Sequence, residues 1–269
     1  MDAMIASLGL PSFVLLGLAV GLFGTLVGAG GGFILVPLLL FLLPHEDADR
    51  ITAISMAVVF FNALSGTVAY ARMRRVDFRA GWRFALAALP GAVLGAVATS
   101  YVSRLWFDRA LGSMLAASAT FLLFRTFHRS GSAVADPKHA DGPFVLDAKG
   151  MRKGIGISSG VGFLSSALGI GGGIAHVPAL VFILGYPVHI ATATSHFVLA
   201  CTTLVAVIEH AVHGSYAGNI GMTAALSVGP VLGAQVGARL SKRVNGRAIV
   251  VCLSLALFAA GVRIVLRTF

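Results

Sequence analysis

The ten residues Gly28-Ala29-Gly30-Gly31-Gly32-Phe33-Ile34-Leu35-Val36-Pro37 return later in the chain as Gly169-Ile170-Gly171-Gly172-Gly173-Ile174-Ala175-His176-Val177-Pro178. In each copy the glycine run separates two apolar pieces, and a helix over the second piece is only about 16 Å long, half of a bilayer core of about 30 Å. Three consecutive glycines favour a break in the helix. Two broken apolar segments at matching positions of two halves are typical of transporters with an internal repeat.

Other interpretations of the glycine runs are weaker. Close helix packing through small residues is the main alternative, although packing does not require three glycines in a row. A phosphate-binding loop is excluded because no Gly-Lys-Ser/Thr follows either run. A dinucleotide fingerprint also fails, since its third glycine would fall at Phe33 and at Ile174.

On this doubled GxGGGxxxVP motif the chain resembles the TauE/SafE family of membrane anion exporters, and the resemblance covers nearly the whole chain. The family's Ala-Thr-Ser near the start of the next helix is present as Ala193-Thr194-Ser195, whereas the first half has Ala53-Ile54-Ser55. The resemblance implies export of sulfite or a small organosulfur anion. The substrate class is an expectation from the family and does not follow from the motif's chemistry.

The composition is that of an integral membrane protein. Hydrophobic residues make up 57% of the chain and charged residues 11%, with long runs that carry no charge. The net charge of +10 comes from arginines clustered in short loops beside apolar segments, which membrane topology explains better than nucleic acid. Cys201 and Cys252 lie in apolar runs and are interpreted as small core residues. We expect a multi-pass protein of the cell inner membrane, with no metal or cofactor and no cleaved signal peptide.

The predicted fold is all-α, with two repeats that each contain a broken-helix hairpin and three transmembrane helices. We place the first repeat at 1–127, a polar cytoplasmic linker at 128–153 and the second repeat at 154–269. The long helices are expected near 51–71, 81–102, 105–127, 189–209, 219–239 and 247–266, each close to the roughly 20 residues that a span needs.

Small residues recur at matching positions in the two halves. Gly91-Ala92 and Gly95-Ala96 in the first half match Gly233-Ala234 and Gly237-Ala238 in the second. Here close helix packing is the favoured explanation. The aromatic residues at the helix ends, Tyr70 and Tyr186 among them, are interpreted as belts at the two water interfaces.

The basic loops predict that the two repeats are inverted. In the first half the basic loop follows the first long helix, at 72–83, whereas in the second half it follows the second long helix, at 239–247. Positive loops prefer the cytoplasm, so placing both there forces opposite orientations. The first hairpin then enters and leaves from outside, and the second from the cytoplasm.

The candidate site lies where the two hairpin tips would face each other across a cavity near the bilayer midplane, because irregular backbone is tolerated there only if it lines a cavity. Helix N-termini at the tips would attract an anion. The two buried histidines are unusual, since ionisable groups in a membrane interior are costly. His196 and His176 are expected to couple transport to protons, although His176 has a structural alternative, a bond to a carbonyl freed by Pro178. The expected substrate-binding residues are Gly30, Gly31, Gly32, Gly171, Gly172, Gly173, Ser55, Asn62, Thr194, Ser195 and His196.

The predicted function is therefore secondary transport of a small anion, with an anion channel as the alternative. A membrane enzyme is disfavoured: Gly156-Ile157-Ser158-Ser159-Gly160 matches a nucleophile-elbow pattern but lies in an apolar helical run without an acidic partner. The sequence leaves open which anion moves, in which direction, with which coupling ion, and whether the unit is a homodimer.

Overall fold

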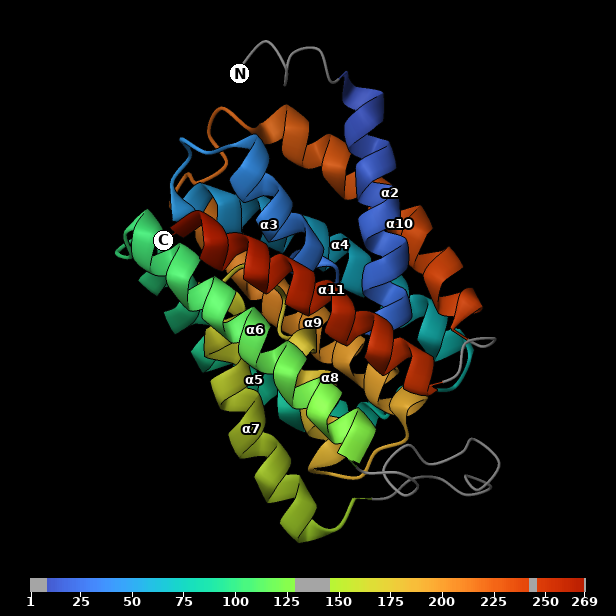
Figure 1. Cartoon of the computed structure of the whole chain (residues 1–269). Helices are drawn as coiled ribbons and strands as arrows, with labels where there is room; N and C mark the ends of the chain where they lie inside the picture. The colour runs from blue at the N-terminus through green and yellow to red at the C-terminus, as the bar shows by residue number, and fades with distance from the viewer. Residues whose placement is uncertain (1–8, 129–145, 242–245, 269) are drawn as a thin grey trace.

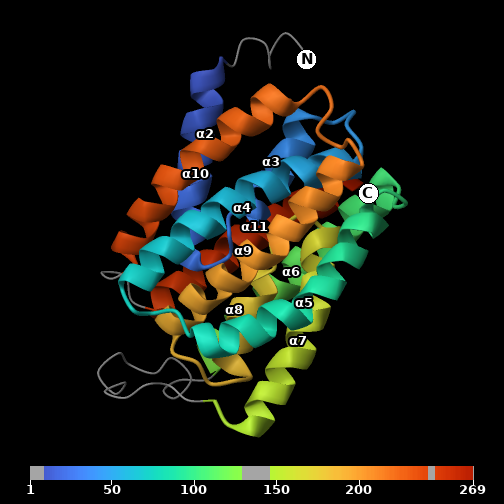
Figure 2. The same cartoon turned by 180° about the vertical axis from the view of Figure 1, so that it is seen from behind.

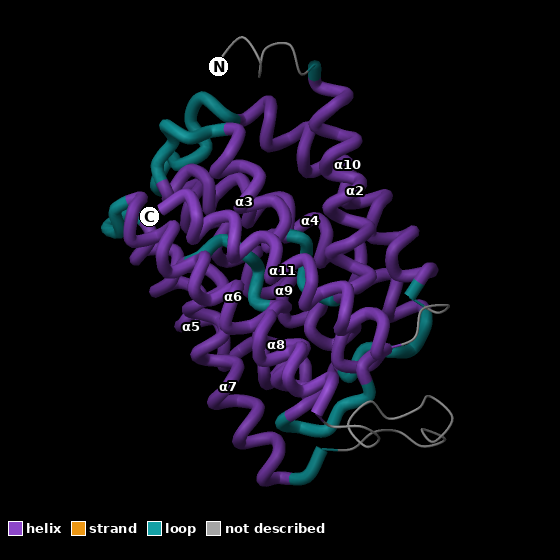
Figure 3. Tube along the Cα trace, viewed as in Figure 1, coloured by secondary structure: helices purple, strands orange, loops and turns teal. Residues whose placement is uncertain are grey.

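The computed structural model describes residues 9–128, 146–241 and 246–268, and the regular structure in these ranges is helical throughout, without a strand (Figure 3). The described residues form ten helices (Figure 1): α2 (Leu10–Val27), α3 (Gly32–Leu42), α4 (Ala48–Arg72), α5 (Phe78–Thr99), α6 (Arg104–His128), α7 (Ala148–Ala167), α8 (Gly173–Phe182), α9 (Val188–Val212), α10 (Ile220–Leu240) and α11 (Gly246–Thr268). The predicted all-helical membrane fold is confirmed.

Both apolar hairpins break at their glycine runs, as predicted. In the first run the φ angles of Gly28, Gly30 and Gly31 are 88°, 76° and 84°, a left-handed conformation that favours glycine. Gly169 and Gly171 adopt the same conformation in the second run. The half-helices α3 and α8 therefore begin immediately after a backbone turn that few other residues adopt.

Five described helices are long and apolar enough to cross a membrane, namely α2, α4, α5, α9 and α10. The half-helices α3 and α8 have 11 and 10 residues and are too short. The predicted spans at 105–127 and 247–266 do form helices, α6 and α11, of 25 and 23 residues. Both fall outside the set of five. Helix α7 begins at Ala148, inside the range predicted as the linker, and residues 129–145 of that range lie outside the described residues.

Small residues bring two pairs of helices into close contact, which confirms the packing interpretation. Cβ atoms at Gly91 and Gly95 of α5 would meet backbone carbonyl oxygens of α7. Cβ atoms at Gly233 and Gly237 of α10 would meet carbonyl oxygens of α2 in the same way. The pair α5–α7 and the pair α2–α10 therefore use the same device, and each joins one half of the chain to the other.

The centre of the molecule is formed by α4 and α9, which lie side by side in both views (Figures 1 and 2). Their membrane segments are largely buried, as expected for helices enclosed by the other pairs. Helices α6 and α11 pack together on one side. Every major contact thus pairs an element of one half with an element of the other.

Polar contacts distinguish the two ends of the molecule. At one end, Nδ1 of buried His210 lies 3.2 Å from Oδ1 of Asp49, and Asn219 donates to Glu46 at 3.3 Å. At the other end, Arg75 donates to Ser241 at 3.5 Å. Figure 1 shows α2 beginning near the first end and α7 at the second. The orientation of these ends in a membrane stays a prediction.

Candidate functional site

The two hairpin tips cross in direct contact at the core of the molecule. A Cβ atom at Gly32 would lie 2.6 Å from the carbonyl oxygen of Ile170. In the reciprocal contact, a Cβ atom at Gly173 would lie 2.5 Å from the Cα of Ala29 and would also meet the carbonyl oxygen of Gly28. Close packing therefore accounts for these contacts. The tips touch, whereas we expected them to face each other across a cavity.

The backbone turn at the first tip satisfies some amides and leaves others open. The N–H groups of Gly28, Ala29 and Gly30 all donate to the carbonyl of Gly24, at 3.0, 3.0 and 3.2 Å. The N–H groups that follow, at the start of α3, have no acceptor among the described residues; they belong to Gly31, Gly32 and Phe33. These open donors lie at the positive end of the α3 dipole, where an anion is favoured.

The second tip has fewer open donors at the start of its half-helix. The N–H of Gly172 donates to the side-chain oxygen of Ser165, and the N–H of Gly173 donates to the carbonyl of Gly171. Of the amides at the start of α8, Ile174 is the one left without an acceptor in the described part of the chain. The N–H groups of Ile170 and Gly171, in the turn before α8, also have no acceptor among the described residues. Similar glycine sequences thus place their open donors differently, at the start of the half-helix in the first tip and mainly in the preceding turn in the second.

Matching residues of α4 and α9 cover the two tips. A Cβ atom at Gly28 would lie 2.7 Å from Thr192, and one at Gly169 would lie 3.0 Å from Thr52. Both threonine hydroxyls are buried and have no hydrogen-bond partner among the described residues. This pair occupies equivalent positions in the two halves and was not predicted as part of the site.

A second matched pair is apolar. Cβ atoms at Gly30 and Gly171 would lie 2.9 and 2.5 Å from Cγ1 of Val59 in α4. The Gly30 Cβ would also lie 2.6 Å from Cδ2 of Leu199 in α9. Val59 and Leu199 are fully buried and exclude water from the crossing point.

His196 belongs to a buried polar network on the first tip. Its Nδ1 lies 3.2 Å from the carbonyl oxygen of Thr192, so the proton is on Nδ1, because a carbonyl can only accept. Its Nε2 lies 3.4 Å from Oγ1 of Thr25, which in turn donates to Oδ1 of Asn62 at 2.8 Å. Tyr70 packs edge-on against the imidazole and donates to the Thr25 carbonyl at 2.8 Å. The Nδ2 group of Asn62 is buried without a partner.

His176 lies in a different environment, beside the second tip. Its Nε2 is 3.1 Å from Oγ of Ser158, and its Nδ1 is buried without a partner in the described structure. The predicted structural alternative, a bond to a carbonyl freed by Pro178, is not what the structure shows. A cavity of 10 Å³ lies here, lined in part by Ser165, His176 and Thr202. This volume is at the lower limit for one water molecule.

The other predicted polar site residues differ in whether they contact a hairpin tip. Ser55 donates to the carbonyl of Gly169 at 2.6 Å and so contacts the second tip. Ser195, its counterpart in the second half, is buried without a hydrogen-bond partner among the described residues. Thr194 accepts the N–H of Asp77 at 3.0 Å. Its hydroxyl is thus engaged by the loop before α5.

Two predicted interfacial tyrosines are instead buried. Tyr70 is 1% exposed and belongs to the His196 network, and Tyr186, also 1% exposed, donates to Oδ2 of Asp77 at 2.9 Å. Burial raises the pKa of the Tyr186 phenol, and the Asp77 carboxylate raises this pKa further, so Tyr186 stays a donor. Sequence reasoning also missed Thr25 and Ser158, because a single Thr or Ser in an apolar helix is too common to signal a site.

Comparison with known proteins identifies the family. The family model described as sulfite exporter TauE/SafE matches residues 13–264. This chain belongs to the TauE/SafE family. It is 30% identical to the probable membrane transporter protein YunE of Bacillus subtilis, over 94% of this chain and 96% of that protein. It is 24% identical to a probable membrane transporter protein of Methanocaldococcus jannaschii, over 94% of each chain.

A third relative, a probable membrane transporter protein of Xylella fastidiosa strain Temecula1, is 29% identical over 86% of this chain and 83% of its own length. No solved structure matches the chain. Membership of the TauE/SafE family confirms a multi-pass membrane transporter and confirms that the chain is not an enzyme. Within the described residues, the surroundings of the two tips offer amide and hydroxyl donors and two imidazoles, and no cluster suited to a metal.

Proposed function

We propose that this chain is a secondary transporter of a small anion across the inner membrane, with sulfite or a sulfonate-type organosulfur anion as the substrate. The observation that carries the proposal is the set of open N–H groups at Gly31, Gly32 and Phe33, located at the start of a helix in the core. A partly buried helix N-terminus contributes up to about 2 kcal/mol to anion binding. The substrate class comes from the family to which the chain belongs.

The contacts around the first tip support a gated site. Val59 and Leu199 pack against Gly30, which directly precedes these N–H groups in the chain. Binding therefore requires α4 and α9 to move relative to the tip. Such a movement of one repeat against the other is the usual means of alternating access in transporters built from repeats. An anion channel, the second candidate, would need a continuous path, and the crossing point is packed.

His196 is proposed to couple the anion to a proton. With the site empty, burial favours the neutral ring, because no opposite charge compensates a buried imidazolium. An anion at the tip would favour protonation at Nε2. That new N–H would donate to Oγ1 of Thr25, which already donates to Asn62, so the network receives the proton without breaking a hydrogen bond. His176 has one partner, Ser158, and is proposed as a secondary proton site.

The test is flux in liposomes that contain the purified full chain. Sulfite, an aliphatic sulfonate, thiosulfate and sulfate are supplied in turn, with and without a pH gradient. We expect concentrative movement of sulfite or the sulfonate that collapses when the proton gradient is dissipated. Flux that follows only the anion gradient and ignores pH would favour the channel, and absence of flux for every sulfur anion would contradict the substrate class.

A further inference from the structure

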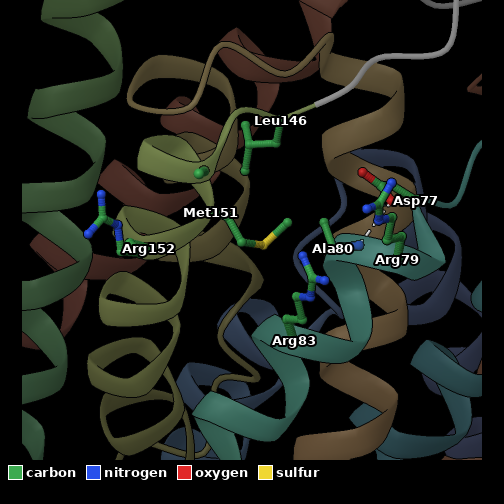
Figure 4. A pocket seen from close by; sticks show the side chains of 8 residues that line it. Asp77, Arg79, Ala80, Arg83, Leu146, Met151 and Arg152 are labelled. Atoms are coloured by element: carbon green, nitrogen blue, oxygen red, sulfur yellow. Dashed lines mark hydrogen bonds between the residues drawn. The ribbon is translucent and has the colours of Figure 1, made fainter.

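A cleft of 420 Å³ opens between the first turns of α5 and α7, apart from the hairpin tips (Figure 4). Three arginines line it: Arg79 and Arg83 from α5 and Arg152 from α7. Figure 4 shows Arg83 extending between Ala80 and Met151, whereas Arg152 extends from α7 away from α5. Figure 4 thus shows Arg83 between the two walls, Arg79 on the Asp77 side of Ala80, and Arg152 at the far edge.

The cations of this cleft are not neutralised by their acidic neighbour. Asp77 is the one carboxylate in the lining, and its two oxygens already accept hydrogen bonds, Oδ1 from the Ala80 N–H at 3.0 Å and Oδ2 from the Tyr186 hydroxyl at 2.9 Å. No ion pair joins Arg79, Arg83 or Arg152 to a carboxylate of the described residues. The cleft therefore retains a positive charge that a bound anion can use.

The rest of the lining is apolar and leads toward the membrane. Leu146, Ala148 and Met151 form the opposite wall. Below the arginines, the same face of α5 continues with Leu86 and Leu94, which are 60% and 62% exposed. The surface of α7 likewise exposes Ile155 and Phe163. In a membrane protein such exposed apolar surface contacts lipid chains, so the cleft lies where headgroups meet the hydrocarbon region.

The matching position in the second half lacks this charge. Gly91 of α5 corresponds to Gly233 of α10, so Arg79 and Arg83 correspond to Gly221 and Ala225. The repeat therefore does not account for the two arginines. They belong to one end of the molecule, the end that also carries the predicted cytoplasmic loops.

We propose that this cleft binds the phosphate headgroup of an anionic phospholipid from the leaflet at that end. Arginine guanidinium groups bind phosphate through two parallel N–H···O bonds, and basic pockets between membrane helices suit anionic headgroups. A small soluble anion would leave most of the 420 Å³ and the apolar wall unfilled. A phospholipid fills both, with its phosphate at Arg79 and Arg83 and its chains against the exposed leucines of α5.

The experiment measures binding of phosphatidylglycerol to the purified full chain in phosphatidylcholine nanodiscs, by native mass spectrometry over a range of lipid fractions. The double variant Arg79→Gln/Arg83→Gln should bind about twenty-fivefold more weakly, at about fivefold for each arginine near a membrane surface. Arg152→Gln should lose less than fivefold. The matched control Arg72→Gln/Arg239→Gln removes two charges from the same end of the molecule and should stay within about twofold of the wild type, because neither arginine lines the cleft and salt screens more distant charges.

A second variant distinguishes a loss of lipid binding from a folding defect. Met151→Trp fills the cleft without removing charge, and it should also weaken binding while the protein stays monodisperse. Equal losses in the double variant and in its control would show a general charge effect and overturn the proposal. Competition by millimolar inorganic phosphate as effective as that by the lipid would assign the cleft to a free anion and also overturn it.

Discussion

The two hairpin tips share a backbone conformation and differ in the polar groups that surround them. Each tip has left-handed glycines, a short apolar half-helix and a buried threonine from the facing central helix, Thr192 at the first tip and Thr52 at the second. The first tip carries three open N–H groups and the linked side chains of Thr25, Asn62 and His196. At the second tip the N–H groups of Gly172 and Gly173 are satisfied, the open ones lie mainly in the turn before α8, and His176 lies beside Ser158.

This difference shows that the two repeats preserve the backbone conformation of the tips more closely than the polar side chains around them. Left-handed glycines are required wherever the chain turns in this way, so both copies keep them. The side chains around each turn come from helices that differ between the halves: Met56 stands where the second half has His196. We therefore expect substrate and proton to meet mainly at the first tip.

The largest expected effect concerns the orientation of the halves. In a background without Cys201 and Cys252, His213→Cys should react with a membrane-impermeant thiol reagent added outside. Arg72→Cys and Arg239→Cys should react only after the membrane is opened, because both basic loops are predicted to be cytoplasmic. All three positions are exposed, whereas Ser215 and Ser241 nearby are buried and unsuitable. Labelling of Arg239→Cys from outside would contradict the inverted arrangement.

Valine at either glycine run should abolish transport, with unequal damage to the fold. At Gly31, whose φ is 84°, a Cβ would lie 2.7 Å from Val20, whereas at Gly172, whose φ is −6°, it would lie 2.9 Å from Val161. A left-handed non-glycine residue costs about 1–2 kcal/mol. The yield of folded protein should therefore be lower for Gly31→Val than for Gly172→Val, measured by fluorescence-detected size exclusion.

The control for the glycine variants is Gly160→Val, because a Cβ at Gly160 meets no atom within 4 Å. This variant should retain both folding and flux. Wild-type flux in Gly31→Val and Gly172→Val would leave the glycines with a packing role alone and would remove the tips from the proposed site.

The two histidine variants should differ in how sulfite flux depends on pH. His196→Gln should lower sulfite flux at least about tenfold and flatten its dependence on pH, since general proton-transfer groups typically contribute factors of this size or more. His176→Gln should lower flux less and preserve the profile, because its ring contacts only Ser158 among the polar side chains of the described structure. Unchanged rate and profile in His196→Gln would exclude this residue from coupling.

The smallest expected effect compares Ser55 with Ser195, which are equivalent residues of the two halves. Ser55→Ala removes the 2.6 Å hydrogen bond to the Gly169 carbonyl and should lower the free energy of unfolding by about 1 kcal/mol. Ser195→Ala removes a buried hydroxyl without a partner in the described residues and should change it little or raise it slightly. Thermal unfolding of both variants in one detergent measures the difference, and equal destabilisation would contradict it.

The sequence by itself determined the local framework of this protein. The apolar runs and the two glycine clusters placed the helices and the two breaks, because hydrophobic length and left-handed turns depend on neighbouring residues. The matching small residues of α5 and α10 also identified the close-packed faces, although they did not identify α7 and α2 as the partners.

The tertiary structure alone decided which side chains meet. Tyr70 was predicted at a water interface, yet it packs against His196, more than a hundred residues away. The hydroxyl of Thr194, one of the predicted anion-binding residues, accepts a hydrogen bond from the N–H of Asp77. These contacts join helices of opposite halves, and no local pattern encodes the partner of a single polar residue. Burial makes each such partner necessary, since an unpaired polar group in the core costs about 1–3 kcal/mol.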